Sequence, residues 1–364
     1  MQQYSSNDLE QSLNYFIRNG FQPHPYFYNC TGVDGDKLGQ KRPYLGTYFI
    51  TMGTILLMIY IPCLIVIARS DLMKSSCYKI MLFLGFLDIA CILSNSITTG
   101  FLGFIGSTFC SYPRIIFIMG SVGCGCWMGS CCACVILAIN RCCDVNHHLP
   151  IRVIFIGNKV YFTMALPIIY TIYSLFFTKP IIFNSNYFSW FFNPMISGHS
   201  PLDYINIAHT INNCIVSGTT TCLYTYLCIL LFHKNRYVQS VSISKTQRQI
   251  FFQSVMICSF NAIAAYIYVY MQFFYSPPEI ILIGQIAWQF AHGSVGIIYI
   301  TMNKTVRRGV IDMICPSVIR NKTRIGTYLF KPTKRPILSI VIGSGPLKQG
   351  GMMTKQTTSS GTVF

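Results

Sequence analysis

The chain has 364 residues, of which 52% are hydrophobic, 15% aromatic and only 10% charged, against about 25% charged residues in an average soluble domain. So few charges cannot cover a surface that faces water, which excludes a soluble globular protein and indicates a membrane protein. The formal net charge of +17 is spread between apolar blocks and a basic tail. It does not form the basic groove with interleaved aromatic residues that nucleic-acid binding needs, so we expect a lipid bilayer and no nucleic acid as partner.

The chain begins with MQQYSSNDLEQSLNYF, which is polar where a signal peptide would have its apolar core. We therefore expect the first membrane helix to act as the targeting signal and residues 1–42 to form an extracellular segment. Asn29 begins the tripeptide NCT, which is an acceptor pattern for N-glycosylation if this segment lies outside.

Seven apolar blocks follow, each long enough, at about 1.5 Å per residue, to cross about 30 Å of hydrocarbon. They are residues 43–68, 80–104, 115–140, 160–178, 204–232, 249–274 and 280–303. The run 180–202 is also uncharged, but its Asn, Ser, Pro and Gly residues predict a long aromatic loop between the fourth and fifth helices. The sequence therefore predicts an all-α membrane protein with a seven-transmembrane helix bundle at residues 43–303.

Lysine and arginine are concentrated in the loops after the first, third and fifth of these helices. The loops after the second, fourth and sixth carry only Arg114 and Lys179. This asymmetry predicts an extracellular N-terminus and a cytoplasmic C-terminus. Lys41 and Arg42, beside the first helix, weakly oppose this orientation, but three basic residues directly after the seventh helix support it.

Asp88 is the only acidic residue inside one of the blocks, and a charge at the centre of a membrane helix costs about 2.5 to 3.5 kcal/mol on the insertion scale. We therefore expect its side chain to face the interior of the bundle. Two interpretations stay open. One is a structural polar network with Asn95, Asn261 or Ser294, and the other is a polar switch that binds a sodium ion or a proton.

Polar residues in the fifth helix (His209, Asn212 and Asn213) and in the seventh (Trp288 and His292) are candidates for a ligand pocket, because sites between helices combine apolar walls with a few polar groups. Each of them, taken singly, also fits an interhelical hydrogen bond. We expect the cysteines of the apolar blocks to be small packing residues and not metal ligands, because a cysteine that binds a metal must be a thiolate, which is unfavourable in hydrocarbon. The sequence has no catalytic motif, and we expect no enzymatic activity, no metal and no cofactor.

Residues 304–316 place Val306, Val310 and two further apolar side chains at helical spacing opposite basic residues, as in a helix that lies at the membrane interface. Cys315 at its end is a candidate for palmitoylation. An ordinary juxtamembrane segment explains the pattern equally well. Residues 317–364 are basic and rich in Gly, Pro and Thr, which predicts a disordered cytoplasmic tail.

Several short stretches, in order along the chain, carry a resemblance. They are YNCTG, GQKRPYLGTY, YIPCLIVIA, SCYKIMLFLGFLDI, FCSYP, LAINRCCDV, YINIAHTINN and HGSVGIIYITMNKTVR. Together they are similar to the nematode serpentine receptor class T, a family of seven-helix chemoreceptors related to the rhodopsin-like G-protein-coupled receptors. The similarity runs from about residue 26 to residue 316 and leaves the first 25 residues and the tail outside.

The resemblance implies a chemosensory receptor in the plasma membrane, at the cilium of a sensory neuron, that binds an external small molecule and activates a heterotrimeric G protein through the cytoplasmic end of helix three. Arg141 there matches the arginine of the Asp/Glu-Arg-Tyr motif that ends helix three in rhodopsin-like receptors, and Asp88 matches the helix-two aspartate of the same broad class. Asn140 stands where the motif has an acid, and Asp144 substitutes only in part, so the lock of the inactive state departs from the family pattern. Arg141 also fits a plain cytoplasmic flank of a membrane helix.

The resemblance also implies a disulfide at the outer end of helix three, where Cys110 in FCSYP matches the cysteine of the rhodopsin-like receptors. The loop 179–203, which usually holds the partner, has no cysteine, and Cys30 is the only other cysteine in a segment that we place outside. We therefore predict a Cys30–Cys110 disulfide. Cys214, the rival partner, lies 11 residues past Asp203, which is too far along a helix for an S–S bond.

A ligand-gated channel or transporter of a chemosensory membrane is the alternative function. It would need a ring of charges or matched broken helices at the middle of the membrane, whereas the sequence shows one aspartate and no such matched interruption. Topology separates the two, because insect-type receptor channels place their N-terminus inside.

Overall fold

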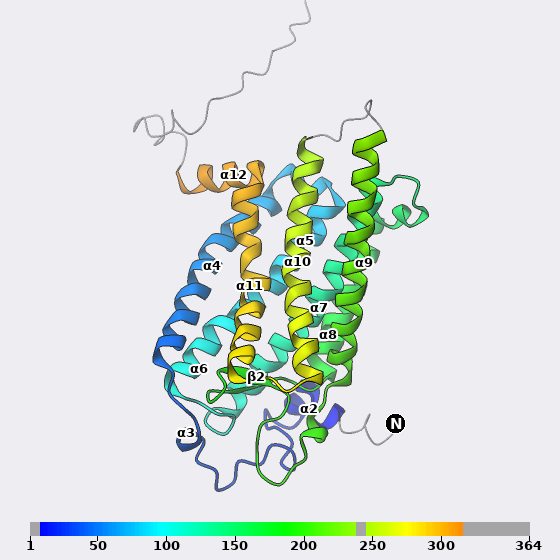
Figure 1. Ribbon diagram of the computed structural model, residues 1–364. Helices are drawn as coiled ribbons and strands as arrows, with labels where there is room; N and C mark the ends of the chain where they lie inside the picture. Colours follow the sequence, from blue (N-terminus) through cyan, green and yellow to red (C-terminus); the bar gives the residue numbers. More distant parts are fainter. Residues whose placement is uncertain (1–7, 238–244, 316–364) are drawn as a thin grey trace, which may run out of the picture. The chain divides into compact units, whose positions relative to one another are not determined.

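The computed structural model describes the backbone of residues 8–237 and 245–315 and the side chains of residues 8–229 and 252–315. Within this part of the chain, seven long helical segments run side by side (Figure 1). They are α4 (Pro43–Arg69), α5 with α6 (Ser76–Ile92 and Thr99–Ile105), α7 (Pro113–Val145), α8 (Lys159–Phe177), α9 (Ile207–Tyr237), α10 (Lys245–Phe273) and α11 (Pro278–Met302). The predicted seven-helix bundle is confirmed.

Shorter elements connect these helices or lie at their ends. They are α2 (Leu13–Arg18), α3 (Gly35–Leu38), η1 (Asp71–Lys74), η2 (Leu93–Thr98), η3 (Pro150–Phe155), β1 (Ile182–Asn184), β2 (Ser189–Phe191), η4 (Pro201–Tyr204) and α12 (Lys304–Ile314). The predicted fifth helix, 204–232, begins later than expected. Tyr204 ends η4, and the side chain of Asn206 accepts the backbone N–H of His209 at 2.9 Å, so it caps α9.

Six helices in the described residues are long and apolar enough to cross a membrane, and α9 is not among them. Polar residues such as Asn212 and Asn213, with several threonines, lower the hydropathy of the described part of α9. Both asparagine side chains are buried, at 5% and 2% exposure. The helix therefore packs as a member of the bundle with both asparagines turned inward, as expected for amides in a membrane helix, whereas Thr221 and Thr225 are exposed.

The central helix, α7, packs against α5, α8, α9 and α10. Gly125 and Gly129 lie one turn apart on its surface toward α8. A Cβ atom would lie 2.7 Å from Cα of Leu175 if added to Gly125, and 2.0 Å from Oγ1 of Thr171 if added to Gly129. Small residues at this spacing let two membrane helices approach closely. The cysteines of α7 are free thiols, and most of them are buried, which agrees with a role in packing.

The second membrane helix is interrupted by η2, a π-helical turn between α5 and α6. In this turn the carbonyl oxygen of Asn95 accepts Nε2 of Gln285 at 3.0 Å, and Nδ2 of Asn95 donates to the carbonyl of Trp288 at 3.2 Å. Nε2 of Gln289 donates to Oγ of Ser96 at 3.0 Å. Such turns are frequent at functional sites. Here the turn fastens the second membrane helix to α11.

The loop predicted over residues 180–202 contains a short antiparallel hairpin of β1 and β2, in which Phe183 lies opposite Trp190. Nε1 of Trp190 donates to Oγ1 of Thr99 at 2.7 Å, which anchors the hairpin to α6. The hairpin lies across the end of the bundle opposite α12 (Figure 1). Strands of three residues are too short to show an alternating pattern in a sequence, so only the loop was predictable.

The N-terminal segment, residues 8–42, packs at the same end of the bundle as the hairpin (Figure 1). The ring of Phe16 stacks on that of Phe117 in α7, with a centroid distance of 4.7 Å. Nζ of Lys179, which is 2% exposed, pairs with Oδ1 of Asp8 at 2.9 Å. The segment is thus folded onto the ends of α7 and α8.

The opposite end of the bundle carries α12, which begins where Oδ1 of Asn303 accepts the backbone N–H groups of Thr305 and Val306 at 3.1 Å. The helix expected over residues 304–316 is present as Lys304–Ile314, with Val306 and Val310 buried and Ile314 exposed, and its place at a membrane interface stays a prediction. The predicted disordered tail, 317–364, lies outside the described residues.

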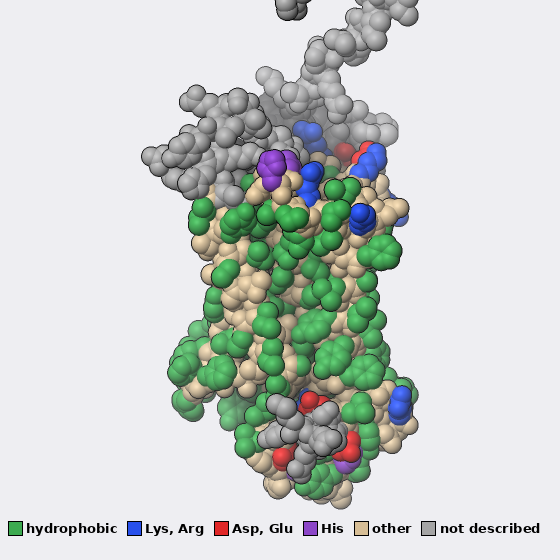
Figure 2. Space-filling model, turned by 90° about the vertical axis from the view of Figure 1, so that its right-hand side faces the viewer, with side chains coloured by type: hydrophobic (Ala, Val, Ile, Leu, Met, Phe, Trp, Pro, Cys, Tyr) green, Lys and Arg blue, Asp and Glu red, His purple; other side chains and the backbone are tan. Residues whose placement is uncertain are grey.

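One face of the molecule shows how the charges are distributed. Its middle is a broad apolar band (Figure 2). Lysine and arginine side chains gather mainly at the end that α12 marks, whereas acidic side chains are seen at both ends. This pattern agrees with a bundle that spans a membrane.

Candidate functional site

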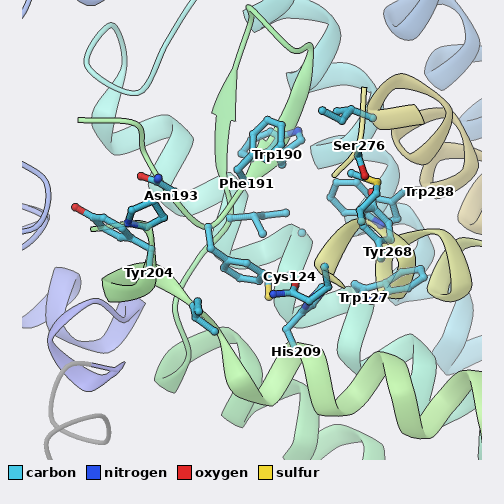
Figure 3. Close-up of a pocket in the computed structure, with 18 residues that line it drawn as sticks. Cys124, Trp127, Trp190, Phe191, Asn193, Tyr204, His209, Tyr268, Ser276 and Trp288 are labelled. Carbon is cyan, nitrogen blue, oxygen red and sulfur yellow. The ribbon is translucent and has the colours of Figure 1, made fainter. Parts of the chain in front are cut away.

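A cavity of about 380 Å³ lies at the hairpin end of the bundle, between α7, α9, α10 and α11. Figure 3 shows Trp127, Tyr268 and Trp288 on one side of it and Asn193 and Tyr204 on the other. The other residues of the wall are Gly123, Cys124, Ile181, Trp190, Phe191, Phe192, Pro201, Ile205, His209, Met271, Gln272, Ser276 and Ile281. A concave, aromatic wall with a few polar groups is typical of a site for a small molecule.

Two of the five residues predicted for a ligand pocket, His209 and Trp288, lie in this wall. Asn212 and Asn213 do not, because Asn212 bonds to Tyr170 of α8 and Asn213 bonds to the wall residues Trp127 and His209 from behind. His292 does not either, because its imidazole is paired with Asp88. The polar residues of the two helices thus divide between the wall, its support and the centre of the bundle.

Asn213 is the central residue of this support. Its Oδ1 accepts Nε1 of Trp127 at 2.9 Å and Nδ2 of Asn212 at 3.1 Å. Because an indole nitrogen can only donate, the amide oxygen of Asn213 must face Trp127, and its amide nitrogen then faces Nε2 of His209 at 3.4 Å. Tyr170 donates to Oδ1 of Asn212 at 3.2 Å. Two wall residues are therefore oriented by one asparagine.

The loop 180–202 contributes wall residues that were not among the predicted pocket residues, notably Trp190, Phe191 and Phe192. The aromatic run SWFF was a visible signal, but it could not be placed over a cavity without the hairpin. Tyr204 closes the wall beside the N-terminal segment. Burial, with a smaller contribution from the charge of Asp203, raises the pKa of the Tyr204 phenol well above its usual range. The phenol therefore stays protonated.

Asp88 lies at the centre of a buried polar group. Its Oδ2 accepts the hydroxyl of Tyr60 at 2.6 Å, and its Oδ1 lies 2.7 Å from Nδ1 of His292. All three side chains are 0% exposed. The predicted partners, Asn95, Asn261 and Ser294, do not bond to Asp88. The carboxylate is instead paired with a tyrosine of α4 and a histidine of α11, which satisfies both of its oxygens.

Ring contacts connect the cavity with this buried group. The indole of Trp127 lies edge-on to the imidazole of His292, with a centroid distance of 5.7 Å and an interplanar angle of 80°. Tyr60 meets Tyr299 in the same manner, with a centroid distance of 5.7 Å. Because Trp127 belongs to the cavity wall, a change in its position acts directly on the partner of Asp88.

Arg141 lies at the other end of α7, and its side chain is 6% exposed. One guanidinium nitrogen donates to Oδ1 of Asn140 and pairs with Oδ2 of Asp144 at 2.7 Å. Nδ2 of Asn140 donates to Oγ of Ser76 at 3.0 Å. A plain cytoplasmic flank would leave the arginine in solvent, whereas this guanidinium is buried and held by two neighbours of its own helix.

The remaining predicted residues lie at the two ends of the bundle. Cys30 and Cys110 form a disulfide that ties the N-terminal segment to the start of α7, and Cys214 is a free, exposed thiol. Asn29, beside the disulfide, is exposed. Cys315 is partly exposed at the end of α12.

The bundle and its end-on cavity define a seven-helix receptor fold. The crystal structure of squid rhodopsin is similar to this chain with a TM-score of 0.50 and 12% sequence identity, over 76% of this chain and 86% of that chain. At this identity the similarity concerns the fold. Together with the membrane-spanning helices, it describes a multi-pass membrane protein of the rhodopsin-like architecture.

Sequence comparison shows the family. The family model described as serpentine type 7TM GPCR chemoreceptor Srt matches residues 11–323. Serpentine receptor class T-55 of Caenorhabditis elegans is 29% identical over 292 residues, which cover 79% of this chain and 80% of that protein. The chain belongs to the serpentine class T family of chemoreceptors, as its sequence motifs predicted. The match begins at residue 11, so the similarity extends further toward the N-terminus than residue 26, where the motifs begin.

Proposed function

We propose that the chain is a chemosensory G-protein-coupled receptor that binds an external small molecule in the cavity and activates a heterotrimeric G protein through the cytoplasmic end of α7. The observation that carries this proposal is the contact between Trp127, in the cavity wall, and His292, the partner of Asp88. A ligand that displaces the indole changes the packing around a buried polar pair. Its binding free energy can therefore shift the balance between two arrangements of the bundle.

The same helix connects the cavity to the coupling site. Trp127 and Arg141 are 14 residues apart on α7, which corresponds to about 21 Å along the helix axis. Asp144, the ionic partner of Arg141, is exposed and belongs to the last turn of the helix. A small displacement of this turn would separate the two groups and free the guanidinium to contact a G protein.

We place the receptor in the plasma membrane of a sensory cilium, with the N-terminus outside and α12 at the cytoplasmic side. The distribution of lysine and arginine supports this orientation, because basic residues favour the cytoplasmic side (Figure 2). The disulfide at the opposite end supports it as well, because that compartment is oxidising. In this orientation the cavity opens toward the outside.

The test is a ligand screen of the full chain in a heterologous cell with a G-protein readout, followed by substitution of Arg141. We expect Arg141→Ala to abolish G-protein activation and to leave surface expression intact. Arg152→Ala is the matched control, because this arginine follows α7 but is exposed. Activation of the Arg141→Ala receptor at wild-type strength would rule out coupling through this residue.

A further inference from the structure

The charge of the cavity wall restricts the charge of its ligand. None of the 18 described residues that line the cavity is Lys, Arg, Asp or Glu. The nearby Lys179 is already paired with Asp8 and donates to the carbonyl of Ile205 at 3.1 Å. Asp203 accepts the backbone N–H of Ser200 at 3.1 Å and faces the loop. An ion that entered the cavity would lose water without gaining a counter-ion, which is strongly unfavourable.

The hydrogen bonds of His209 determine which of its ring nitrogens carries the proton. The amide nitrogen of Asn213 faces Nε2 of His209, because the amide oxygen is taken by Trp127. Nε2 is therefore the acceptor, and a neutral imidazole must carry its hydrogen on Nδ1. Nδ1 is buried and has no hydrogen-bond partner among the described residues. The wall thus contains an N–H donor without an acceptor.

A tryptophan provides a second donor of the same kind. All three tryptophans of the chain line the cavity. The N–H of Trp127 is donated to Asn213, and that of Trp190 is donated to Thr99. Nε1 of Trp288 is buried, and the described part of the chain offers it no acceptor. A buried donor without a partner costs about 1 to 3 kcal/mol, so a ligand that supplies an acceptor gains free energy.

We infer that the cavity is selective for a neutral molecule with an aromatic or aliphatic body and a hydrogen-bond acceptor, such as a ketone, an ester or a ring nitrogen, to which a small rotation of the His209 or Trp288 ring presents the buried N–H. The inference rests on the proposed function for the identity of the site. It adds the chemical class of the ligand, because the aromatic wall selects the body and the two free N–H groups select the acceptor.

The experiment uses benzophenone, a neutral aromatic ketone that crosslinks on illumination, with the full-length receptor in lipid nanodiscs. The matched probes are 4-benzoylbenzoate, an anion, and 4-(aminomethyl)benzophenone, a cation. We expect benzophenone to label peptides of the cavity wall, and the two ions to need at least about 100-fold higher concentration. Acetophenone should compete with this labelling better than ethylbenzene, which has the same carbon skeleton without the carbonyl.

Substitution of the two donors tests their role. Trp288→Phe and His209→Phe each remove one N–H and keep a ring, and each should weaken competition by acetophenone about three- to tenfold while leaving ethylbenzene unchanged. Trp190→Phe is the control, because its N–H already has an acceptor in Thr99. This variant should retain the preference for acetophenone over ethylbenzene.

Equal labelling by the charged probes, or equal competition by acetophenone and ethylbenzene, would overturn the inference. So would an unchanged preference in both donor variants. Labelling needs no G protein, so Arg141→Ala should be labelled like the wild type. If labelling follows the expected pattern and no compound activates a G protein, the proposed function fails and the ligand class stands. If only ions or hydrocarbons activate a G protein, the ligand class fails and the proposed function stands.

Discussion

Asp88 shows how a single charged residue organises the centre of the bundle. A carboxylate in a membrane interior is tolerated only when its oxygens have partners, and here Tyr60 and His292 supply one partner each. Asparagine has nearly the same shape. It can still accept from Tyr60 and can donate to a neutral His292, but it cannot carry the negative charge.

We therefore expect Asp88→Asn to fold and reach the surface, with altered basal or ligand-driven activity. Asp88→Ala removes the common acceptor of two buried side chains and should lower the free energy of unfolding by about 3 to 5 kcal/mol. Thermal unfolding and a G-protein assay measure the two effects. Asp71→Asn is the control, because that exposed carboxylate pairs with the exposed Lys74. Unchanged activity and stability in Asp88→Asn would leave the aspartate without the role proposed here.

Single residues were predictable where they contrast with their surroundings. Asp88 and Arg141 stand out because a charge next to or inside an apolar block needs an explanation. The partner of Asp88 was not predictable, because His292 lies 204 positions away in the sequence and no spacing rule connects them. Trp127 was missed for a different reason. Aromatic residues make up 15% of the chain, so composition gives no means of telling the wall of a cavity from lipid-facing residues.

The packing of α7 against α8 depends on small residues. Gly125→Ala adds a methyl group that would lie 2.7 Å from backbone atoms of Leu175, so α8 must move. We expect the free energy of unfolding to fall by about 1 to 3 kcal/mol, which exceeds the gain in helix propensity. Gly218→Ala in α9 is the matched control, because no atom lies within 4 Å of the added Cβ. A Gly125→Ala protein as stable as the control would contradict this close packing.

The N-terminal segment is the element whose position depends on a covalent bond. The Cys30–Cys110 disulfide joins residues 80 positions apart, which in the chain-entropy model stabilises by about 4 to 5 kcal/mol. We therefore expect the same loss of surface expression and thermal stability in Cys30→Ser, in Cys110→Ser and in the double variant, because each breaks the same bond.

Cys214→Ser is the control for these variants, since this thiol is free and exposed. Peptide mapping without reduction tests the bond directly. Recovery of the Cys30 peptide alone, or linked to Cys214, would exclude the pairing, and unequal losses in the two single variants would point to another role for one cysteine.

Element positions followed from the sequence where hydrophobic length decides them. The seven apolar blocks correspond to the seven helical segments, because crossing a membrane requires a continuous apolar run. The π-helical turn at Leu93–Thr98 and the hairpin were not predictable. Both depend on partners in distant elements, such as Gln285 for the turn and Thr99 for the hairpin. The cavity wall uses the hairpin, so it was not predictable either.

At the scale of the whole molecule, the orientation in the membrane decides which end receives the ligand. The sequence predicts it from lysine and arginine, and the disulfide at the end of the N-terminal segment supports the same direction. Besides Asn29, the sequence has two Asn-x-Thr patterns, the NKT tripeptides that begin at Asn303 and Asn321. Asn303 is 2% exposed and caps α12, so its amide is occupied whichever side it faces. Asn321 lies outside the described residues. Asn29 is the acceptor that can report the topology, because it is exposed in the N-terminal segment.

We predict that Asn29 is glycosylated, because an exposed Asn-x-Thr in a segment outside the cell meets the glycosylation machinery during membrane insertion. Glycosidase treatment should increase the mobility of the wild-type protein on a gel, and Asn29→Gln and Thr31→Ala should each abolish this shift. His148→Thr, made in the Asn29→Gln background, creates an acceptor at Asn146 in the exposed loop after α7, which the predicted topology places in the cytoplasm. A glycosidase shift in that double variant would place this loop outside. The cavity would then open toward the cytoplasm, and an external ligand could not reach it.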